Sequence, residues 1–368
     1  MLLSESSSMT LRSPIMASHK EPSPVRTMVV DDSVVVRTVV ERILNADPAF
    51  RVVHKTNSAE HALAYLAEHE VDLVLLDIEL PGQSGLTALP AFLRANPRGK
   101  VVILSGNCEE GSAPAVEALA LGASDILAKP GSGSFGEEFP RSLIDRLSRL
   151  FGDERILGAP AATIGPAATD QARAPLACLG IGASTGGIHA LGQLFAGLPA
   201  PLGVPILLTQ HLPASFISYF VQQLARMTSL RVKAAEQGEM LIPDTVYVAP
   251  GDHNLQLRKG LHGRVMVVLN PDRTSTGNLP GVDPMFSSMA EAFGEGAAGV
   301  ILTGMGRDGT VGARDIVAAG GWIVAQDEAS SVVWGMPGSV ATAGLTCAML
   351  EPYAIMDFVA RRGKRMAH

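Results

Sequence analysis

Apolar, strand-like runs alternate with stretches of helical periodicity in two blocks of the chain, and this alternation limits the possible folds most strongly. In the first block, the predicted strands are Arg26–Val30, Arg51–Lys55, Val71–Leu76, Val101–Leu104 and Ser124–Leu127. Strands that are separated by helices form right-handed crossover units, in which helices cover both faces of a parallel sheet. The first block therefore predicts a parallel α/β domain.

The alternation resumes after a segment of different composition. Residues 152–174 are rich in Ala, Gly, Pro and Thr without apolar periodicity, which is typical of a linker. The core strands predicted beyond it are Leu176–Gly180, Val204–Thr209, Thr245–Ala249, Gly299–Thr303 and Trp322–Gln326. Leu255–Arg258 and Val265–Leu269 are expected to form a hairpin inserted in the second sheet.

The fold predicted for the chain is α/β, with two doubly wound parallel-sheet domains joined by the linker. The predicted boundaries are a disordered extension over residues 1–24, a first domain over 25–151, the linker over 152–174 and a second domain over 175–368.

Composition excludes several classes of protein. A net charge of −7 and a pI of about 5.7 argue against a nucleic-acid surface, which needs a concentrated basic face. No apolar run reaches the roughly 18 residues of a membrane helix, and residues 1–24 lack the apolar stretch of a signal peptide. Cys108, Cys178 and Cys347 show no metal-ligand spacing and fit a reducing compartment. We therefore expect a cytoplasmic protein without membrane insertion.

Polar side chains stand at the carboxyl ends of strands in the first block, where open parallel sheets place their sites. They are Asp31, Asp32, Asp77, Ser105 and Lys129. Converging carboxylates repel one another, and a divalent ion with oxygen ligands, Mg²⁺, would relieve that repulsion. The lysine and the hydroxyl could hold phosphoryl oxygens on Asp77. Singly, Asp32 could cap a helix and Lys129 could be solvated, but their joint occurrence favours a site.

Residues 26–130 resemble the receiver domain of two-component response regulators, through Val-Asp-Asp-Ser, Leu-Asp-Ile-Glu-Leu-Pro-Gly, Ile-Leu-Ser-Gly and Ala-Lys-Pro. The resemblance implies a flavodoxin-like fold, Asp77 as the phosphoacceptor and a histidine kinase as the phosphodonor. It also implies Mg²⁺ ligands and sensors of the phosphoryl group, namely Asp31, Asp32, Asp77 and the Glu79 carbonyl as ligands, and Ser105 and Lys129 as sensors.

In the second block, the strand that ends near Gly180 runs into Gly-Ala-Ser-Thr-Gly-Gly. Such a turn presents the hydroxyl of Ser184 beside unpaired backbone N–H groups that can receive an oxyanion. A turn without chemistry and a dinucleotide-binding loop are the alternatives. A dinucleotide site needs an acidic residue at the end of the next strand to bind the ribose hydroxyls. Here that strand ends in Gln210-His211, which argues against a dinucleotide site.

His211 follows Ser184 by 27 positions (211 − 184) and is placed to take the serine proton. A carboxylate at another strand end would complete the unit, and Asp308 is the candidate to orient Nδ1 of His211. Asp308 could also cap the following helix, and the two roles are compatible. The chain order Ser, His, Asp is allowed because geometry defines a triad.

From Leu176 to Arg361 the chain resembles the catalytic domain of the CheB family of chemotaxis protein-glutamate methylesterases/glutaminases, through Gly-Ala-Ser-Thr-Gly-Gly, Gln-His-Leu-Pro, Ala-Pro-Gly-Asp-His and Thr-Gly-Met-Gly-Arg-Asp-Gly. The resemblance implies a Rossmann-like domain in which Ser184 is the nucleophile, His211 the base and acid, and Asp308 the orienting carboxylate. Thr185 and Met305 would line the oxyanion and substrate pocket. The implied reactions are demethylation and deamidation of chemoreceptors, with no cofactor in the catalytic site.

The segment Leu279–Asp283 departs from the family, which usually has an arginine before the proline and a serine after it. This departure bears on how an acidic helical substrate is gripped. Two other hypotheses remain open: a phosphorylation-gated binding module whose catalysis has lapsed, and a nucleotide-dependent oxidoreductase. For the enzyme, we expect the unphosphorylated receiver to cover the Ser184 crevice until Asp77 is phosphorylated.

Overall fold

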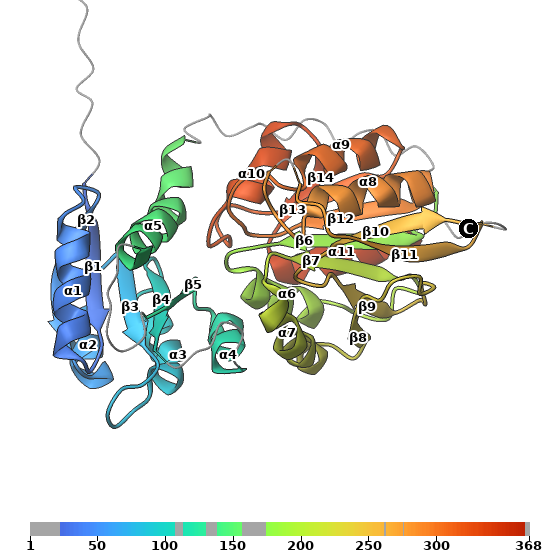
Figure 1. Ribbon diagram of the computed structural model, residues 1–368. Coiled ribbons are helices and arrows are strands. Elements are labelled where there is room, and N and C mark those ends of the chain that lie inside the picture. Colours follow the sequence, from blue (N-terminus) through green and yellow to red (C-terminus); the bar gives the residue numbers. More distant parts are fainter. Residues whose placement is uncertain are drawn as a thin grey trace, which may run out of the picture.

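A computed structural model describes residues 23–106, 113–129, 138–156, 174–260, 263–274 and 276–364. This part of the chain contains a five-stranded sheet, a seven-stranded sheet and a two-stranded sheet (Figure 1). The predicted extension, most of the predicted linker and Cys108 lie outside the described residues.

The first domain is a parallel sheet in the order β2-β1-β3-β4-β5. Its strands are β1 (Val25–Val30), β2 (Phe50–Thr56), β3 (Leu73–Asp77), β4 (Lys100–Ser105) and β5 (Asp125–Ala128). Its helices are α1 (Val34–Asn45), α2 (Ala59–Leu66), α3 (Gly85–Ala95), α4 (Ala113–Leu121) and α5 (Glu138–Ile156). The prediction of a parallel α/β sheet is confirmed. Helix α5 runs past the predicted domain end at residue 151, because residues 151–156 contain no proline to stop it.

Serine N-caps fix where the helices of this domain begin. Ser33, Ser58 and Ser84 each accept a hydrogen bond from the backbone N–H three residues ahead. The cap at Ser33 starts α1 directly after Asp31 and Asp32, so both acids remain at the edge of the sheet. Strand β3 is buried along its whole length and carries Asp77 to the same edge.

The second domain is a parallel sheet in the order β14-β13-β12-β6-β7-β9-β8. Its strands are β6 (Cys178–Ala183), β7 (Ile206–Gln210), β8 (Arg231–Ala234), β9 (Thr245–Val248), β12 (Ala297–Ile301), β13 (Trp322–Gln326) and β14 (Thr346–Leu350). Its helices are α6 (Gly187–Ala196), α7 (Ala214–Met227), α8 (Val282–Phe293), α9 (Thr310–Ala318), α10 (Gly335–Thr342) and α11 (Pro352–Lys364). The five predicted core strands are confirmed. Edge strands β8 and β14 and helix α10 were not predicted. The two edge strands were missed because they are largely half-buried and lack a strong apolar run.

The predicted hairpin exists as β10 (Asn254–Lys259) and β11 (Val265–Asn270), but it forms a sheet of its own instead of joining the second sheet. Leu257 and Val267 turn their side chains into the core cluster that contains Phe286 of α8. The hairpin therefore extends the helical layer that covers the sheet. Helices α8, α9 and α10 lie on that face, and α6, α7 and α11 lie on the other (Figure 1).

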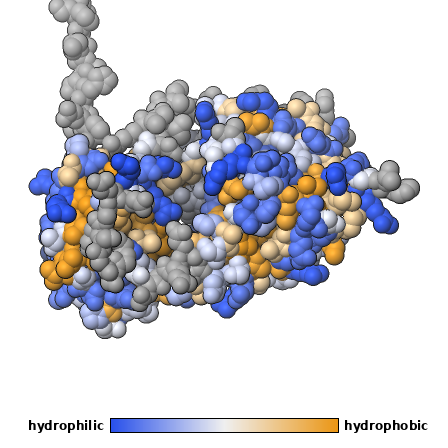
Figure 2. Space-filling model, viewed as in Figure 1, coloured by the Kyte–Doolittle hydropathy of each residue, from blue (hydrophilic) through white to orange (hydrophobic). Residues whose placement is uncertain are grey.

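The two domains touch along α4. Ala115 and Val116 are buried in the same apolar cluster as Ile217 of α7, and His189 of α6 donates from Nδ1 to the carbonyl of Ala120 over 3.1 Å. This contact places the receiver beside the carboxyl edge of the second sheet. Hydrophilic side chains cover much of the visible face of both domains (Figure 2). Among the described residues, no helix is long and apolar enough to cross a membrane.

Candidate functional sites

The acidic residues predicted in the first domain converge. Carboxylate oxygens of Asp31, Asp32 and Asp77 lie within 4.8 Å of one another. Lys129 Nζ lies 2.6 Å from Asp31 Oδ2 and 2.7 Å from Asp77 Oδ2. Ser105 is buried at the end of β4, and its carbonyl accepts a bond from the Lys129 N–H over 2.7 Å. The three aspartates and the lysine therefore share one crevice, and the Ser105 backbone is bonded to that of Lys129 at the end of the neighbouring strand.

Electrostatics in this crevice favour a cation. Burial raises the pKa of Asp77, and Asp31 adds to this effect while Lys129 opposes it. Burial alone would lower the pKa of Lys129, but its bonds to Asp31 and Asp77 outweigh burial and raise it. Three carboxylates face one ammonium group, and an all-oxygen donor set with surplus negative charge fits Mg²⁺. The Glu79 N–H donates to Asp77 Oδ1 over 3.2 Å, and the ligand role of its carbonyl stays a prediction.

In the second domain, the turn after β6 is held through the carbonyl of Ser184. This oxygen accepts from the Gly187 N–H over 2.8 Å and from Gln210 Nε2 over 2.8 Å. Gly186 has a φ of 75°, in the left-handed region, and a Cβ there would lie 2.6 Å from Val332. The turn therefore requires glycine, as the sequence pattern indicated.

Backbone donors beside Ser184 differ in their availability. The Ser184 N–H donates to the Thr303 carbonyl over 3.1 Å. Within the described residues, the N–H groups of Thr185 and Met305 have no hydrogen-bond acceptor, and both residues line the same cavity as Ser184. These two groups are the candidates for an oxyanion hole.

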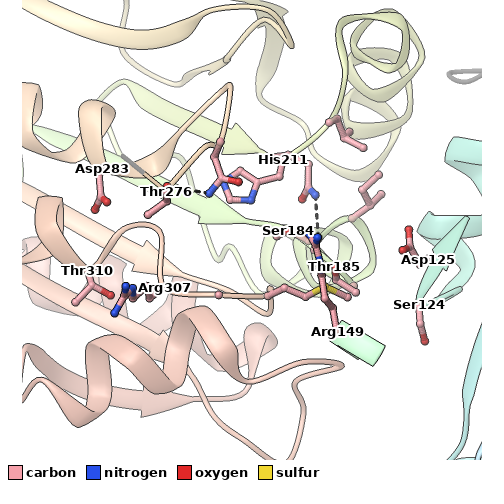
Figure 3. A pocket seen from close by; sticks show the side chains of 18 of the residues that line it. Ser124, Asp125, Arg149, Ser184, Thr185, His211, Thr276, Asp283, Arg307 and Thr310 are labelled. Carbon is pink, nitrogen blue, oxygen red and sulfur yellow. Dashed lines mark hydrogen bonds between the residues drawn. The ribbon is translucent and has the colours of Figure 1, made fainter. Parts of the chain in front are cut away.

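His211 is brought to Ser184 by strand register. Ala183 of β6 pairs with Gln210 of β7, so the next residue of each strand emerges at the same edge of the sheet. The His211 N–H also donates to the Ala183 carbonyl over 3.0 Å. Ser184 and His211 both line a cavity of about 1130 Å³ (Figure 3).

Asp308 contacts the histidine through the nitrogen that was not expected. His211 Nε2, and not Nδ1, lies 2.8 Å from Asp308 Oδ2. Asp308 follows β12, and β6 lies between β12 and β7 in the sheet, so the histidine has to reach across with its distal nitrogen. Nδ1 is the nitrogen that remains for Ser184.

The Asp308 carboxylate is also the cap of helix α8. It is 1% exposed and accepts bonds from the N–H groups of Val282 (2.8 Å), Asp283 (3.1 Å) and Gly309 (3.0 Å). Burial would raise the pKa of Asp308, but the bonds from His211 and from the two α8 N–H groups outweigh it, and the pKa lies below its ordinary value. Asp308 therefore contacts the histidine and caps α8, but it does not cap the following helix α9, whose N-cap Gly309 has no side-chain cap bond. The sequence pattern had suggested that following helix.

Asp283 lines the cavity. The sequence pattern singled it out only as part of Leu279–Asp283, the segment that differs from the CheB family. Its Oδ1 accepts from the Gly312 N–H over 2.9 Å. Burial and the neighbouring Asp308 raise its pKa to about 6. Leu279, in the same segment, lines an adjoining cavity of about 450 Å³ that also contacts His211. The sequence alone could not identify Asp283 as a cavity residue with a raised pKa, because its nearness to Asp308 depends on the fold.

The receiver forms one wall of the main cavity. Asp125 of β5 and Arg149 of α5 line it opposite Ser184 (Figure 3). Met305 and Val332, from two loops of the second domain, pack against the apolar cluster that contains Leu147 of α5. The first domain thus stands at the mouth of the predicted crevice.

Fold and sites define a class of protein in which a receiver is joined to an α/β domain with a serine, histidine and aspartate at one sheet edge. The chain belongs to the CheB methylesterase family. Residues 179–359 match the CheB methylesterase family model, and residues 27–134 match the response regulator receiver domain.

Similar proteins span the whole chain. Protein-glutamate methylesterase/protein-glutamine glutaminase 2 of Caulobacter vibrioides is 39% identical over 93% of this chain and 100% of that protein. Protein-glutamate methylesterase/protein-glutamine glutaminase 1 of Rhodospirillum rubrum is 36% identical over 97% of this chain and 100% of that protein. The solved CheB methylesterase catalytic domain of Thermotoga maritima is 35% identical over 51% of this chain and 100% of that chain, with a TM-score of 0.49.

Proposed function

We propose that this protein is a cytoplasmic, phosphorylation-activated serine hydrolase that demethylates glutamate methyl esters, and deamidates glutamines, on chemoreceptors in chemosensory adaptation. The observation that carries the proposal is the 2.8 Å contact between His211 Nε2 and the buried Asp308, in a cavity that Ser184 shares. Relatives that align over 93% and 97% of this chain bear the names of both activities.

In the proposed reaction, Ser184 Oγ attacks the side-chain carbonyl carbon of the methylated glutamate while Nδ1 of His211 takes the hydroxyl proton. The N–H groups of Thr185 and Met305 hold the oxyanion. Methanol leaves with the proton from His211. Water then gives a proton to Nδ1 and attacks the acyl-enzyme, and Nδ1 returns that proton to Ser184 Oγ as glutamate is released. With glutamine as substrate, ammonia is the leaving group.

Asp308 supports this cycle because it stays ionised. Its lowered pKa keeps a negative charge against Nε2, which stabilises the imidazolium that forms when Nδ1 takes the serine proton. The three backbone donors around the carboxylate keep it from rotating away from the ring.

Asp77 is the proposed phosphoacceptor, with a histidine kinase as donor. Asp31, Asp32 and Asp77 would hold Mg²⁺, and the Glu79 carbonyl would be a further ligand. The ion supplies charge neutralisation for the phosphoryl oxygens. Ser105 and Lys129 would contact those oxygens, because the lysine uses only two of its three N–H donors in its bonds to Asp31 and Asp77. Phosphorylation would therefore change the contacts at the carboxyl edge of the first sheet.

Inhibition by the unphosphorylated receiver is the second part of the proposal. The receiver buries α4 against α6 and α7 and lines the cavity with Arg149, so a large substrate reaches Ser184 only when this contact opens. A chain beginning near Pro175 should then be at least as active as the unphosphorylated full chain. Markedly lower activity of the shorter chain would argue against inhibition.

The test is methanol release from methylated receptor membranes, with and without acetyl phosphate as phosphodonor and with Ser184→Ala as the control. We expect release that depends on Ser184 and increases with the phosphodonor. Binding of the membranes without any methanol release would favour the binding module over the enzyme.

A further inference from the structure

Two arginines from helix α9 and the turn before it line the cavity that contains Ser184. Arg307 lies in the turn before α9, and Val311 and Arg314 lie one helical turn apart on the same face. All three line the cavity that contains Ser184 and His211. The two arginines are exposed, and Val311 between them is 53% exposed.

The charges around the cavity are unevenly balanced. On the receiver side, Arg149 is paired with Asp145 at 2.6 Å, and Arg146 lies 3.8 Å from Asp125. Among the described residues, neither Arg307 nor Arg314 forms an ion pair or a side-chain hydrogen bond. The second domain thus presents two exposed arginines without an ion-pair partner, in a cavity whose acid on the same domain, Asp283, is largely buried. Such a local field attracts carboxylates.

We propose that Arg307, Val311 and Arg314 bind an acidic amphipathic helix of the substrate, with one apolar residue on Val311 and carboxylates on the two guanidinium groups. Arg307 precedes the first residue of α9 and Arg314 lies in its second turn, so carboxylates on either side of the apolar substrate residue can meet the two guanidinium groups. This inference rests on the proposed function, which supplies the reacting glutamyl ester. It adds the residues of this protein that recognise the substrate residues on either side of that ester.

The adjoining cavity offers less cationic surface. Leu279 and Pro280 present apolar surface there, and Arg273 donates to the Gly277 carbonyl within its own loop over 2.9 Å. The α9 side of His211 places two arginines along one wall, which suits a substrate with two carboxylates.

The experiment compares two helical peptides, each with one central γ-methyl glutamate. One carries glutamates one turn to either side of the ester, and its neutral twin carries serines there. The measured quantity is the ratio of kcat/KM for methanol release, acidic over neutral, with the full chain, Mg²⁺ and acetyl phosphate. The variants are the double changes Arg307→Glu/Arg314→Glu and Arg307→Gln/Arg314→Gln, with Arg231→Glu on edge strand β8 as the matched exposed control.

We expect the ratio to fall by about tenfold in the glutamate variant and by about threefold in the glutamine variant, and to stay unchanged in the control. In the unaltered protein the ratio should shrink as salt rises from about 0.05 to about 0.5 M, because exposed charges are screened. A general loss of folding lowers both rates and leaves the ratio unchanged.

An unchanged ratio in both double variants overturns the proposal. An unchanged ratio with a higher rate before phosphorylation also overturns it, since the arginines would then hold an acidic part of the receiver. Failure of the proposed function has a different signature, because the unaltered protein would release no methanol from either peptide. In that case, binding of the two peptides, labelled with a fluorophore, to the same variants still tests the α9 surface by anisotropy.

Discussion

Two substitutions of Asp308 distinguish its contact with His211 from its capping of helix α8. Asp308→Ala removes the partner of His211 Nε2 and leaves the N–H groups of Val282, Asp283 and Gly309 without their acceptor. Each buried N–H that loses a charged acceptor costs about 1–3 kcal/mol, and the losses are not fully additive. We expect a loss of about 3–5 kcal/mol, which lowers Tm by roughly 6–20 °C for a domain of this size.

Asp308→Asn keeps much of the cap, because the amide oxygen still accepts from two backbone N–H groups. Its amide N–H₂ can donate to His211 Nε2, which forces the ring proton onto Nδ1, where the serine proton has to go. We expect a loss of only about 1–2 kcal/mol in stability, and a decrease of about 10⁴ in kcat, the size seen when an amide imposes the wrong tautomer on a triad.

The assay is methanol release together with thermal melting of both variants, and Glu291→Ala on the exposed side of α8 is the control. The asparagine variant should be the more stable of the two and no more active. If it kept more than a tenth of the normal kcat, Asp308 would not orient His211. If the alanine variant melted like the unaltered protein, the carboxylate would not cap α8.

Three further predictions concern phosphorylation, the domain contact and pH. Asp77→Asn, or removal of Mg²⁺ with EDTA, should abolish the stimulation by acetyl phosphate and leave the basal methanol release intact. His189→Ala removes a bond between the domains worth about 1 kcal/mol, so the unphosphorylated rate should rise by up to about fivefold while the phosphorylated rate stays constant. Folding raises the pKa of Asp283 from 3.8 to about 6, so stability should decrease as the pH rises through this window, by about 2–3 kcal/mol, and a melting series of Asp283→Asn should lack this decrease.

The sequence predicted what depends on local pattern. Buried strands such as β3 are continuous apolar runs, and N-caps such as Ser33 stand next to a helical period, so both are visible in the chain. Strand order in a parallel sheet then brings Asp31, Asp77 and Lys129 to one edge. These features needed no knowledge of packing between the helices.

Features set by packing were predicted wrongly or missed. The hairpin β10–β11 packs on α8 because Leu257 and Val267 find the core cluster there, which alternation alone cannot reveal. The nitrogen that His211 offers to Asp308 follows from the strand lying between them, and the pKa of Asp283 follows from the nearness of a second acid. Each depends on distances between segments remote in sequence.

The departing segment Leu279–Asp283 affects substrate grip more than hydrolysis, because its contacts with the triad are made by the backbone. Asp308 accepts hydrogen bonds from the backbone N–H groups of Val282 and Asp283. These backbone donors do not depend on which side chains the segment carries. A leucine at position 279 changes only the surface of the adjoining cavity. Under the proposed function, loss of a cation there would leave the proton relay in place, and recognition of an acidic substrate would rest on Arg307 and Arg314.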